Sequence, residues 1–182
     1  MGSEVPYSYG TRRADMMSLL CGRATAFEIK SEGDKISRLE HQLESYRAFF
    51  DYCYVVCERS NLSAVRRNIS SSFGIILVTD EAVKVSRKSK RFKRHNKEAL
   101  ASILTTSELK KLTRQYNLRS KHELCRFASI KFTLSLICKL SRDKLAARYS
   151  PSTRLLKADV ISKINPDDIQ TITKHYPTDL SL

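Results

Sequence analysis

Glu28 and Lys30 are the two residues whose types and spacing best suit chemistry on a phosphate group. They fall in residues 24–30, which read as a β-strand, and side chains along a strand alternate between its two faces. Glu28 and Lys30 therefore share one face, where a carboxylate can bind a cation and an ammonium can offset negative charge. Such pairs also occur on solvated strands, where they contribute little, so neighbouring residues must decide the interpretation.

Asp15 is the first neighbour that matters. Residues 13–20 are apolar-rich and read as another strand, and Cys21-Gly22-Arg23 reads as a hairpin turn between the two strands. We therefore expect the carboxylate of Asp15 to reach the same point as that of Glu28.

The second neighbour is a predicted helix downstream. Apolar residues recur at helical spacing over residues 35–51, and Asp34 is a good N-cap. Gln42 and Tyr46 are one turn apart on this helix, so they share a face. Both flank the apolar stripe, and we expect them to look toward the sheet.

Asp15, Glu28-x-Lys30 and Gln42-x-x-x-Tyr46 together resemble the PD-(D/E)XK superfamily of restriction-endonuclease-like nucleases, in particular its QxxxY-containing RecB-like branch. The run from RADMMSLL to FFDYCYVV is similar to small bacterial and phage members. The resemblance covers roughly residues 11–80. It implies five catalytic residues: Asp15, Glu28, Lys30, Gln42 and Tyr46.

The resemblance also implies a cofactor. Asp15 and Glu28, with the Ile29 carbonyl, would hold Mg²⁺ or Mn²⁺, which prefer oxygen ligands. Lys30 would orient the attacking water and stabilise the transition state, while Gln42 and Tyr46 would hold the catalytic groups or contact the substrate backbone.

The chain departs from the family pattern in two places. Ala14 stands where many members have Pro. The usual first helix is missing, because Pro6 and Gly10 disfavour a helix in the short segment before residue 13. Glu4 is a candidate for the acidic role that this helix often supplies, with a plain surface residue as the alternative. We expect the C-terminal helices or a second subunit to complete the core.

The fold class that we predict is α/β: a restriction-endonuclease-like mixed sheet flanked by helices, followed by an all-helical C-terminal region. Residues 1–96 would form the nuclease-like core, and residues 97–182 would pack on it or contact nucleic acid. Further strands are predicted at 52–57, 74–79 and 82–86, and a further helix at 61–71.

The second half shows no strand pattern. A helix capped by Ser107 is predicted to run through Tyr116, and a longer one to cover residues 121–140. Pro151 reads as the start of another helix, and Asn165 opens a last short one. The first pair weakly resembles the helix-turn-helix of SAP-like DNA-binding modules, although a bundle that completes the core is the favoured interpretation.

The charge points to a polyanionic partner. Lys and Arg number 33 against 19 Asp and Glu, which gives a formal net charge of +14 and a pI of about 9.8. Such an excess attracts nucleic acid, while solubility or an anionic membrane surface are the alternatives. The densest run is predicted to track phosphates, with Phe92 stacking on a base, or to be a solvated linker; it comprises Arg87, Lys88, Lys90, Arg91, Lys93, Arg94 and Lys97.

Other residue classes argue for a reduced, cytoplasmic protein. The five cysteines form no CxxC pair, so we expect packed thiols. The four histidines lack ligand spacing and are expected at the surface. No apolar stretch approaches the roughly 18 residues that a membrane helix needs, and no secretory signal is visible.

Two functional hypotheses follow. The first is a metal-dependent nuclease that hydrolyses phosphodiester bonds of nucleic acid, most favourably DNA. The second is a nucleic-acid-binding protein on the same fold that cuts nothing, such as a phage or mobile-element regulator or decoy. The oligomeric state is left open, with a homodimer among the alternatives.

Overall fold

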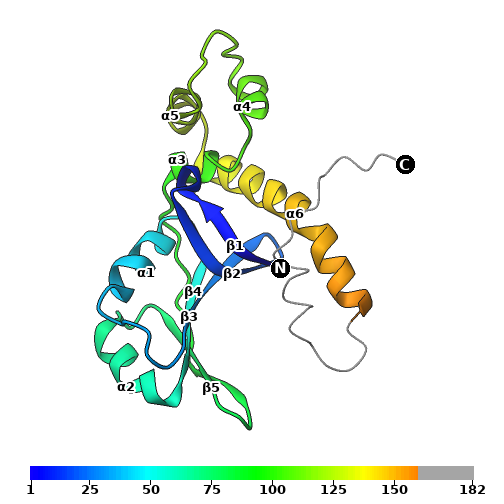
Figure 1. Ribbon diagram of the computed structural model, residues 1–182. Coiled ribbons are helices and arrows are strands. Elements are labelled where there is room, and N and C mark those ends of the chain that lie inside the picture. Colours follow the sequence, from blue (N-terminus) through cyan, green and yellow to red (C-terminus); the bar gives the residue numbers. More distant parts are fainter. Residues whose placement is uncertain (160–182) are drawn as a thin grey trace.

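The computed structural model describes residues 1–159. It contains a sheet with helices on both sides and a helical end (Figure 1). The strands are β1 (Gly2–Tyr7), β2 (Arg12–Leu20), β3 (Arg23–Lys30), β4 (Tyr52–Glu58), β5 (Gly74–Val78) and β6 (Val83–Arg87). The helices are η1 (Ser8–Gly10), α1 (Leu39–Arg47), α2 (Arg59–Asn68), α3 (Lys97–Ala101), α4 (Thr106–Thr113), α5 (Lys121–Lys131) and α6 (Leu134–Asp159).

The sheet is mixed, and its spatial order follows the sequence from β1 to β6. β1, β2 and β3 form an antiparallel meander, β3 to β5 are parallel, and β6 returns antiparallel to β5. The parallel steps are made through α1 and α2, which lie together on one side of the sheet (Figure 1). The predicted α/β class with a mixed sheet and a helical C-terminal region is therefore confirmed.

The β2–β3 hairpin turns at Cys21 and Gly22, as the sequence predicts. Both residues have positive φ, 49° and 70°, which is the backbone that a two-residue type I′ turn requires. The resulting register pairs Met16 with Phe27 and Met17 with Ala26. This register sets Asp15 beside Glu28 on the neighbouring strand.

The face of α1 that meets the sheet carries Leu39, Leu43 and Tyr46, all buried. Phe49 and Phe50, directly after the helix, are fully buried and pack edge-on against each other, with ring centroids 4.8 Å apart. This aromatic cluster fixes the helix over β3 and β4 and thereby fixes the position of the Tyr46 side chain.

α6 covers the other side of the meander. It runs along β1 and β2 (Figure 1), where buried Leu145 and Tyr149 meet the sheet. Gly2 is needed beneath it, because a Cβ there would lie 2.5 Å from the Tyr149 ring. A C-terminal helix thus completes the core, as one of the two sequence alternatives expects.

Several predicted boundaries are wrong. The segment before residue 10, where the sequence disfavours a helix, contains the strand β1, which adds a member to the predicted sheet. α1 begins only at Leu39; Asp34 instead accepts hydrogen bonds from the Ser31 N–H and hydroxyl, at 2.8 and 2.9 Å, and closes a turn.

The C-terminal helices also differ from prediction. Thr105, not Ser107, caps α4 through a capping box with Glu108. The helix predicted over residues 121–140 is broken, because Phe132 adopts extended backbone after α5. Pro151 lies inside α6 and does not start a helix. The helix predicted at Asn165 lies outside the described residues.

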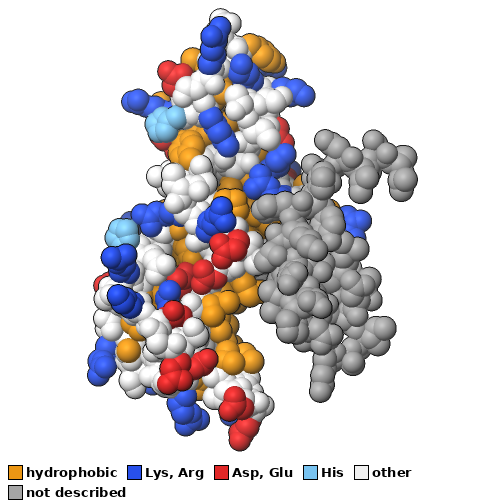
Figure 2. All heavy atoms as spheres, in the orientation of Figure 1, with side chains coloured by type: hydrophobic (Ala, Val, Ile, Leu, Met, Phe, Trp, Pro, Cys, Tyr) orange, Lys and Arg blue, Asp and Glu red, His pale blue; other side chains and the backbone are white. Residues whose placement is uncertain are grey.

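No helix within residues 1–159 is long and apolar enough to cross a membrane. Lys and Arg side chains are spread over the end that carries α4 and α5 and over the α1–α2 side, as Figure 2 shows. Hydrophobic side chains occupy a strip between them, over the strands.

Candidate functional site

Glu28 is a buried charge at the centre of the sheet. It sits in β3 with only 2% of its surface exposed, while its neighbour Ile29 points to the opposite face and is 43% exposed. Strand alternation therefore turns Glu28 and Lys30 together toward the α1 side, as the sequence predicts. The Lys30 side chain is 12% exposed and lies at the rim of this site.

Both carboxylate oxygens of Glu28 have a partner. The Lys30 ammonium donates to Oε1 at 2.7 Å, and the Tyr46 hydroxyl donates to Oε2 at 2.5 Å. A buried carboxylate is tolerable only with such charge-assisted partners. Burial, followed by the charge of Glu28, raises the pKa of Tyr46, so this hydroxyl stays a donor across the accessible pH range.

Asp15 joins the same cluster from β2. Its Oδ2 accepts a 2.7 Å hydrogen bond from the Ile29 N–H, which holds the carboxylate against the strand that carries Glu28. Burial raises the pKa of Asp15, and Glu28 raises it further, against the opposing effects of the Ile29 N–H and Lys30. Two carboxylates that repel each other in this way suit a bound cation, which would offset both negative charges.

The other two candidates are less tightly held. Gln42 is half-buried on α1, one turn before Tyr46. Glu4 is exposed, has a left-handed φ of 47°, and pairs at 3.8 Å with the exposed side chain of Arg13. Its charge raises the pKa of Asp15, so Glu4 lies within electrostatic reach of the cluster.

The donor set matches a hard divalent cation in kind. Asp15 and Glu28 supply carboxylate oxygens, which Mg²⁺ and Mn²⁺ prefer. In the part of the chain that the structure describes, no group of three or more His, Cys, Asp and Glu side chains is placed to hold a metal. A cation there would share Glu28 with Lys30 and Tyr46 and complete its shell with water or substrate oxygens.

The basic run divides into two sets. Arg87 donates to the Phe73 and Ser70 carbonyls, at 2.8 and 3.2 Å, and Lys97 donates to the Phe132 carbonyl at 3.1 Å, so these two residues tie the chain to the core. The remaining five side chains are exposed and available to phosphates: Lys88, Lys90, Arg91, Lys93 and Arg94.

Phe92 does not face a ligand. It is 6% exposed, packs against Phe73 with ring centroids 5.4 Å apart, and lies under the Arg47 guanidinium at 5.2 Å. Its predicted role in base stacking is therefore wrong, because the ring anchors the basic run to the core.

Sequence reasoning missed a second charged cluster. The side chain of His95, expected at the surface, is only 5% exposed, and its Nε2 lies 3.6 Å from Asp51 Oδ1. Arg142 of α6 donates to Asp51 Oδ2 at 3.1 Å and to the Phe49 carbonyl at 2.5 Å. These residues share no local pattern; an Asp directly before a buried strand was the one available signal.

The fold and the site define a mixed α/β protein with a buried carboxylate–lysine–tyrosine cluster on its central strands. Residues 1–173 match the family described as Bacteriophage P4 protein cII, and the chain belongs to this family. It is 32% identical over 128 residues to protein cII of Enterobacteria phage P4, across 68% of this chain and 48% of that protein. The chain therefore spans about half the length of this relative.

A solved structure gives a further comparison. The chain is similar to the SPO1766 protein of unknown function from Silicibacter pomeroyi, with 15% identity and a TM-score of 0.41. The match covers 72% of this chain and 77% of the other.

Proposed function

We propose that this protein is a metal-dependent nuclease of the PD-(D/E)XK type that hydrolyses phosphodiester bonds of nucleic acid, with DNA as the favoured substrate. The observation that carries the proposal is the meeting of Asp15, Glu28 and Lys30 on adjacent strands, with Tyr46 donating to Glu28. Three residues that the sequence singles out, Glu28, Lys30 and Tyr46, are thus joined by hydrogen bonds, and Asp15 is held beside them through the Ile29 N–H.

Each residue of the cluster has a role that follows from its chemistry. Asp15 and Glu28 would hold Mg²⁺ or Mn²⁺, which, when bound, polarises the scissile phosphate and acidifies an attacking water. Lys30, at the rim of the site, brings a positive charge to the phosphate oxygens where negative charge develops. Tyr46 fixes the Glu28 carboxylate, and Gln42 remains a candidate for contact with the substrate backbone.

The topology supports the proposal. The antiparallel meander carries Asp15 on β2 and Glu28 and Lys30 on β3, and α1 then leads to the parallel strand β4. This is the hairpin-then-helix layout that the resemblance implies. Where the superfamily usually has its first helix, this chain has the strand β1, and α6 packs on β1 and β2.

A second candidate function has its own support. Both oxygens of Glu28 are engaged and the residue is 2% exposed, so the cluster as it stands is a closed ion pair. The exposed members of the basic run lie outside it. A protein that binds nucleic acid through these cations and cuts nothing fits the same geometry.

A cleavage assay separates the two functions. End-labelled single-stranded DNA, duplex DNA and RNA are incubated with the protein in Mg²⁺, Mn²⁺ or EDTA, beside Glu28→Gln. The nuclease predicts products that require metal and disappear in the variant, whose fold is checked by circular dichroism. Undiminished cleavage in EDTA would contradict the proposal, and binding without any products would favour the second function.

A further inference from the structure

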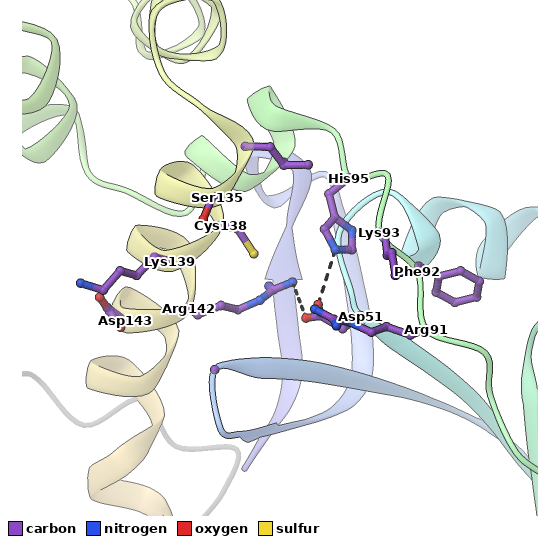
Figure 3. A pocket seen from close by; sticks show the side chains of 12 residues that line it. Asp51, Arg91, Phe92, Lys93, His95, Ser135, Cys138, Lys139, Arg142 and Asp143 are labelled. Carbon is purple, nitrogen blue, oxygen red and sulfur yellow. Dashed lines mark hydrogen bonds and ion pairs between the residues drawn. The ribbon is translucent and has the colours of Figure 1, made fainter.

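A pocket of about 470 Å³ lies between the basic run and α6. Its floor is formed by Asp51, His95 and Arg142, and Arg91 and Lys93 line it from the basic run (Figure 3). Asp51 immediately precedes β4, whereas Val55 is the residue of β4 that pairs with Glu28. Four residues of strand separate the two positions by about 13 Å, so this pocket is distinct from the Glu28 cluster.

The floor of the pocket contains hydrogen-bonding atoms without partners. Arg142 is 2% exposed, yet within the described residues its Nε and Nη1 have no hydrogen-bond acceptor. The Nδ1 of His95 is likewise buried without a partner there. The Cys138 thiol, which also lines the pocket, interacts with Arg142. A thiol is only a weak acceptor and does not replace a full hydrogen bond to a guanidinium. A buried donor without an acceptor costs free energy, so an acceptor group bound in the pocket would be stabilised there.

The charges select an anion. Asp51 cannot satisfy the free donors, because its Oδ2 already accepts from Arg142 and the Ala24 N–H and its Oδ1 faces His95. Arg91 and Lys93 add two exposed cations at the opening. Lys139 and Asp143 also line the pocket, but their side chains point away from its floor, on the outer side of α6 (Figure 3).

We propose that this pocket binds a phosphate group of a nucleic-acid strand. The Arg142 guanidinium keeps unpaired N–H groups at Nε and Nη1, and each can donate a charge-assisted hydrogen bond to a phosphate oxygen. His95 adds a third donor at Nδ1 when its imidazole is protonated, and Arg91 and Lys93 attract the strand. The phosphate chemistry stands on the pocket alone, and the choice of nucleic acid as its source rests on the proposed function.

The first arm of the test uses inorganic phosphate as the probe. Thermal unfolding of the full chain is followed in EDTA with increasing phosphate, against chloride at matched ionic strength. Phosphate should raise the melting temperature of the wild type, because a ligand that binds the folded state stabilises it. His95→Gln and Arg142→Gln should weaken phosphate binding by about tenfold or more, the usual effect of losing a charged hydrogen bond.

The second arm identifies the source of the phosphate. Fluorescence anisotropy in EDTA compares 5′-phosphorylated and 5′-hydroxyl DNA oligonucleotides. A preference for the phosphorylated end identifies a terminal phosphate, and equal affinities with competition by inorganic phosphate identify a backbone phosphate. Arg91→Ala and Lys93→Ala should weaken binding, whereas Lys84→Ala, an exposed lysine outside the pocket, removes the same charge as a control.

The two arms keep this inference separate from the nuclease. All binding is measured without metal and repeated in Glu28→Gln, so loss of cleavage does not alter the result. Phosphate affinity that is unchanged in folded His95→Gln and Arg142→Gln would overturn the proposal. If Arg142→Gln does not fold, the surface variants decide: oligonucleotide affinities of Arg91→Ala and Lys93→Ala equal to that of Lys84→Ala would overturn it as well.

Discussion

Glu28 holds its charge where almost none of it reaches solvent, and this burial sets the demands on the residues around it. Lys30 and Tyr46 each satisfy one of its oxygens, and Asp15 is fixed beside it through the Ile29 N–H. Removing one partner would leave part of a buried charge uncompensated, which costs more than the partner contributes. The buried charges of the cluster therefore suit ligand binding but lower the stability of the folded protein.

The neighbouring carboxylate leads to a prediction about pH. Because burial and Glu28 raise the pKa of Asp15, the folded state binds this proton more tightly than the unfolded chain does. Stability from the group is then fully present below the unfolded pKa of about 4 and is lost as the pH rises through the folded value. Asp15→Asn should therefore be more stable than wild type at neutral pH, by a margin that disappears near pH 3.

Urea unfolding at several pH values measures this margin. The exposed Asp80 offers a matched control, and Asp80→Asn should show no comparable gain. An Asp15→Asn protein that is less stable than wild type at pH 7 would mean that Asp15 is a structural residue and not part of a strained site.

The sequence predicts those site residues that lie close together along the chain. Glu28 and Lys30 share a face by strand alternation, and Tyr46 meets Glu28 because a helix follows the strand. Asp51, His95 and Arg142 could not be found in this way, since three separate segments bring them together. A buried histidine also has no signature that distinguishes it from a surface one.

At the scale of elements, α6 links the sheet to the pocket that contains Arg142. It closes the side of the meander that α1 and α2 leave open, and it brings Arg142 to the floor of the pocket. Leu145 is fully buried on this helix and lines a small cavity together with Met17 and Leu19 of β2. The helix is thus part of the core and not an appendage.

Leu145→Ala tests this packing. Truncating a fully buried leucine should lower the free energy of unfolding by about 2–5 kcal/mol, in one transition that includes the sheet. Leu136→Ala on the same helix, where the side chain is 38% exposed, should cost less than about 1 kcal/mol. Urea unfolding followed by far-ultraviolet circular dichroism gives both values. If Leu145→Ala lowers the free energy of unfolding as little as Leu136→Ala does, α6 is not part of the core.

Most elements of the sheet were predictable because their signals are local: the type I′ turn at Gly22, the apolar strands and the amphipathic α1. β1 was not predicted because Pro6 and Gly10 disfavour a helix but do not by themselves indicate a strand, although pairing with β2 tolerates proline in an edge strand. The unbroken course of α6 past Pro151 was missed because proline usually marks a helix start or stop, and tertiary packing overrides that preference here.

At the scale of the whole molecule, the net charge of +14 favours polyanionic partners. The cations spread over more than one surface, and within the basic run two of them are committed to the core. The electrostatic footprint is therefore broader than the run itself. Five exposed side chains of the run remain free to neutralise phosphates.

The salt dependence of DNA binding tests this division. Lys88→Ala and Lys90→Ala should each reduce the slope of log affinity against log salt by about one, because one fewer counterion is released. Arg87→Ala should instead lower stability, since it removes hydrogen bonds to the Phe73 and Ser70 carbonyls. Anisotropy titrations at several salt concentrations supply the slopes. Unchanged slopes in both lysine variants would show that the basic run does not contact DNA phosphates.

The most direct test of the central claim is the single-turnover rate of DNA cleavage in Mg²⁺ for wild type, Lys30→Ala and Lys35→Ala. Lys35 is exposed just beyond the strand and controls for the loss of one charge. We expect Lys30→Ala to cut at least a hundredfold more slowly than wild type, because a charge partner of the transition state is removed, and Lys35→Ala to cut as wild type does. Equal rates for all three proteins would contradict a catalytic centre at Glu28 and Lys30.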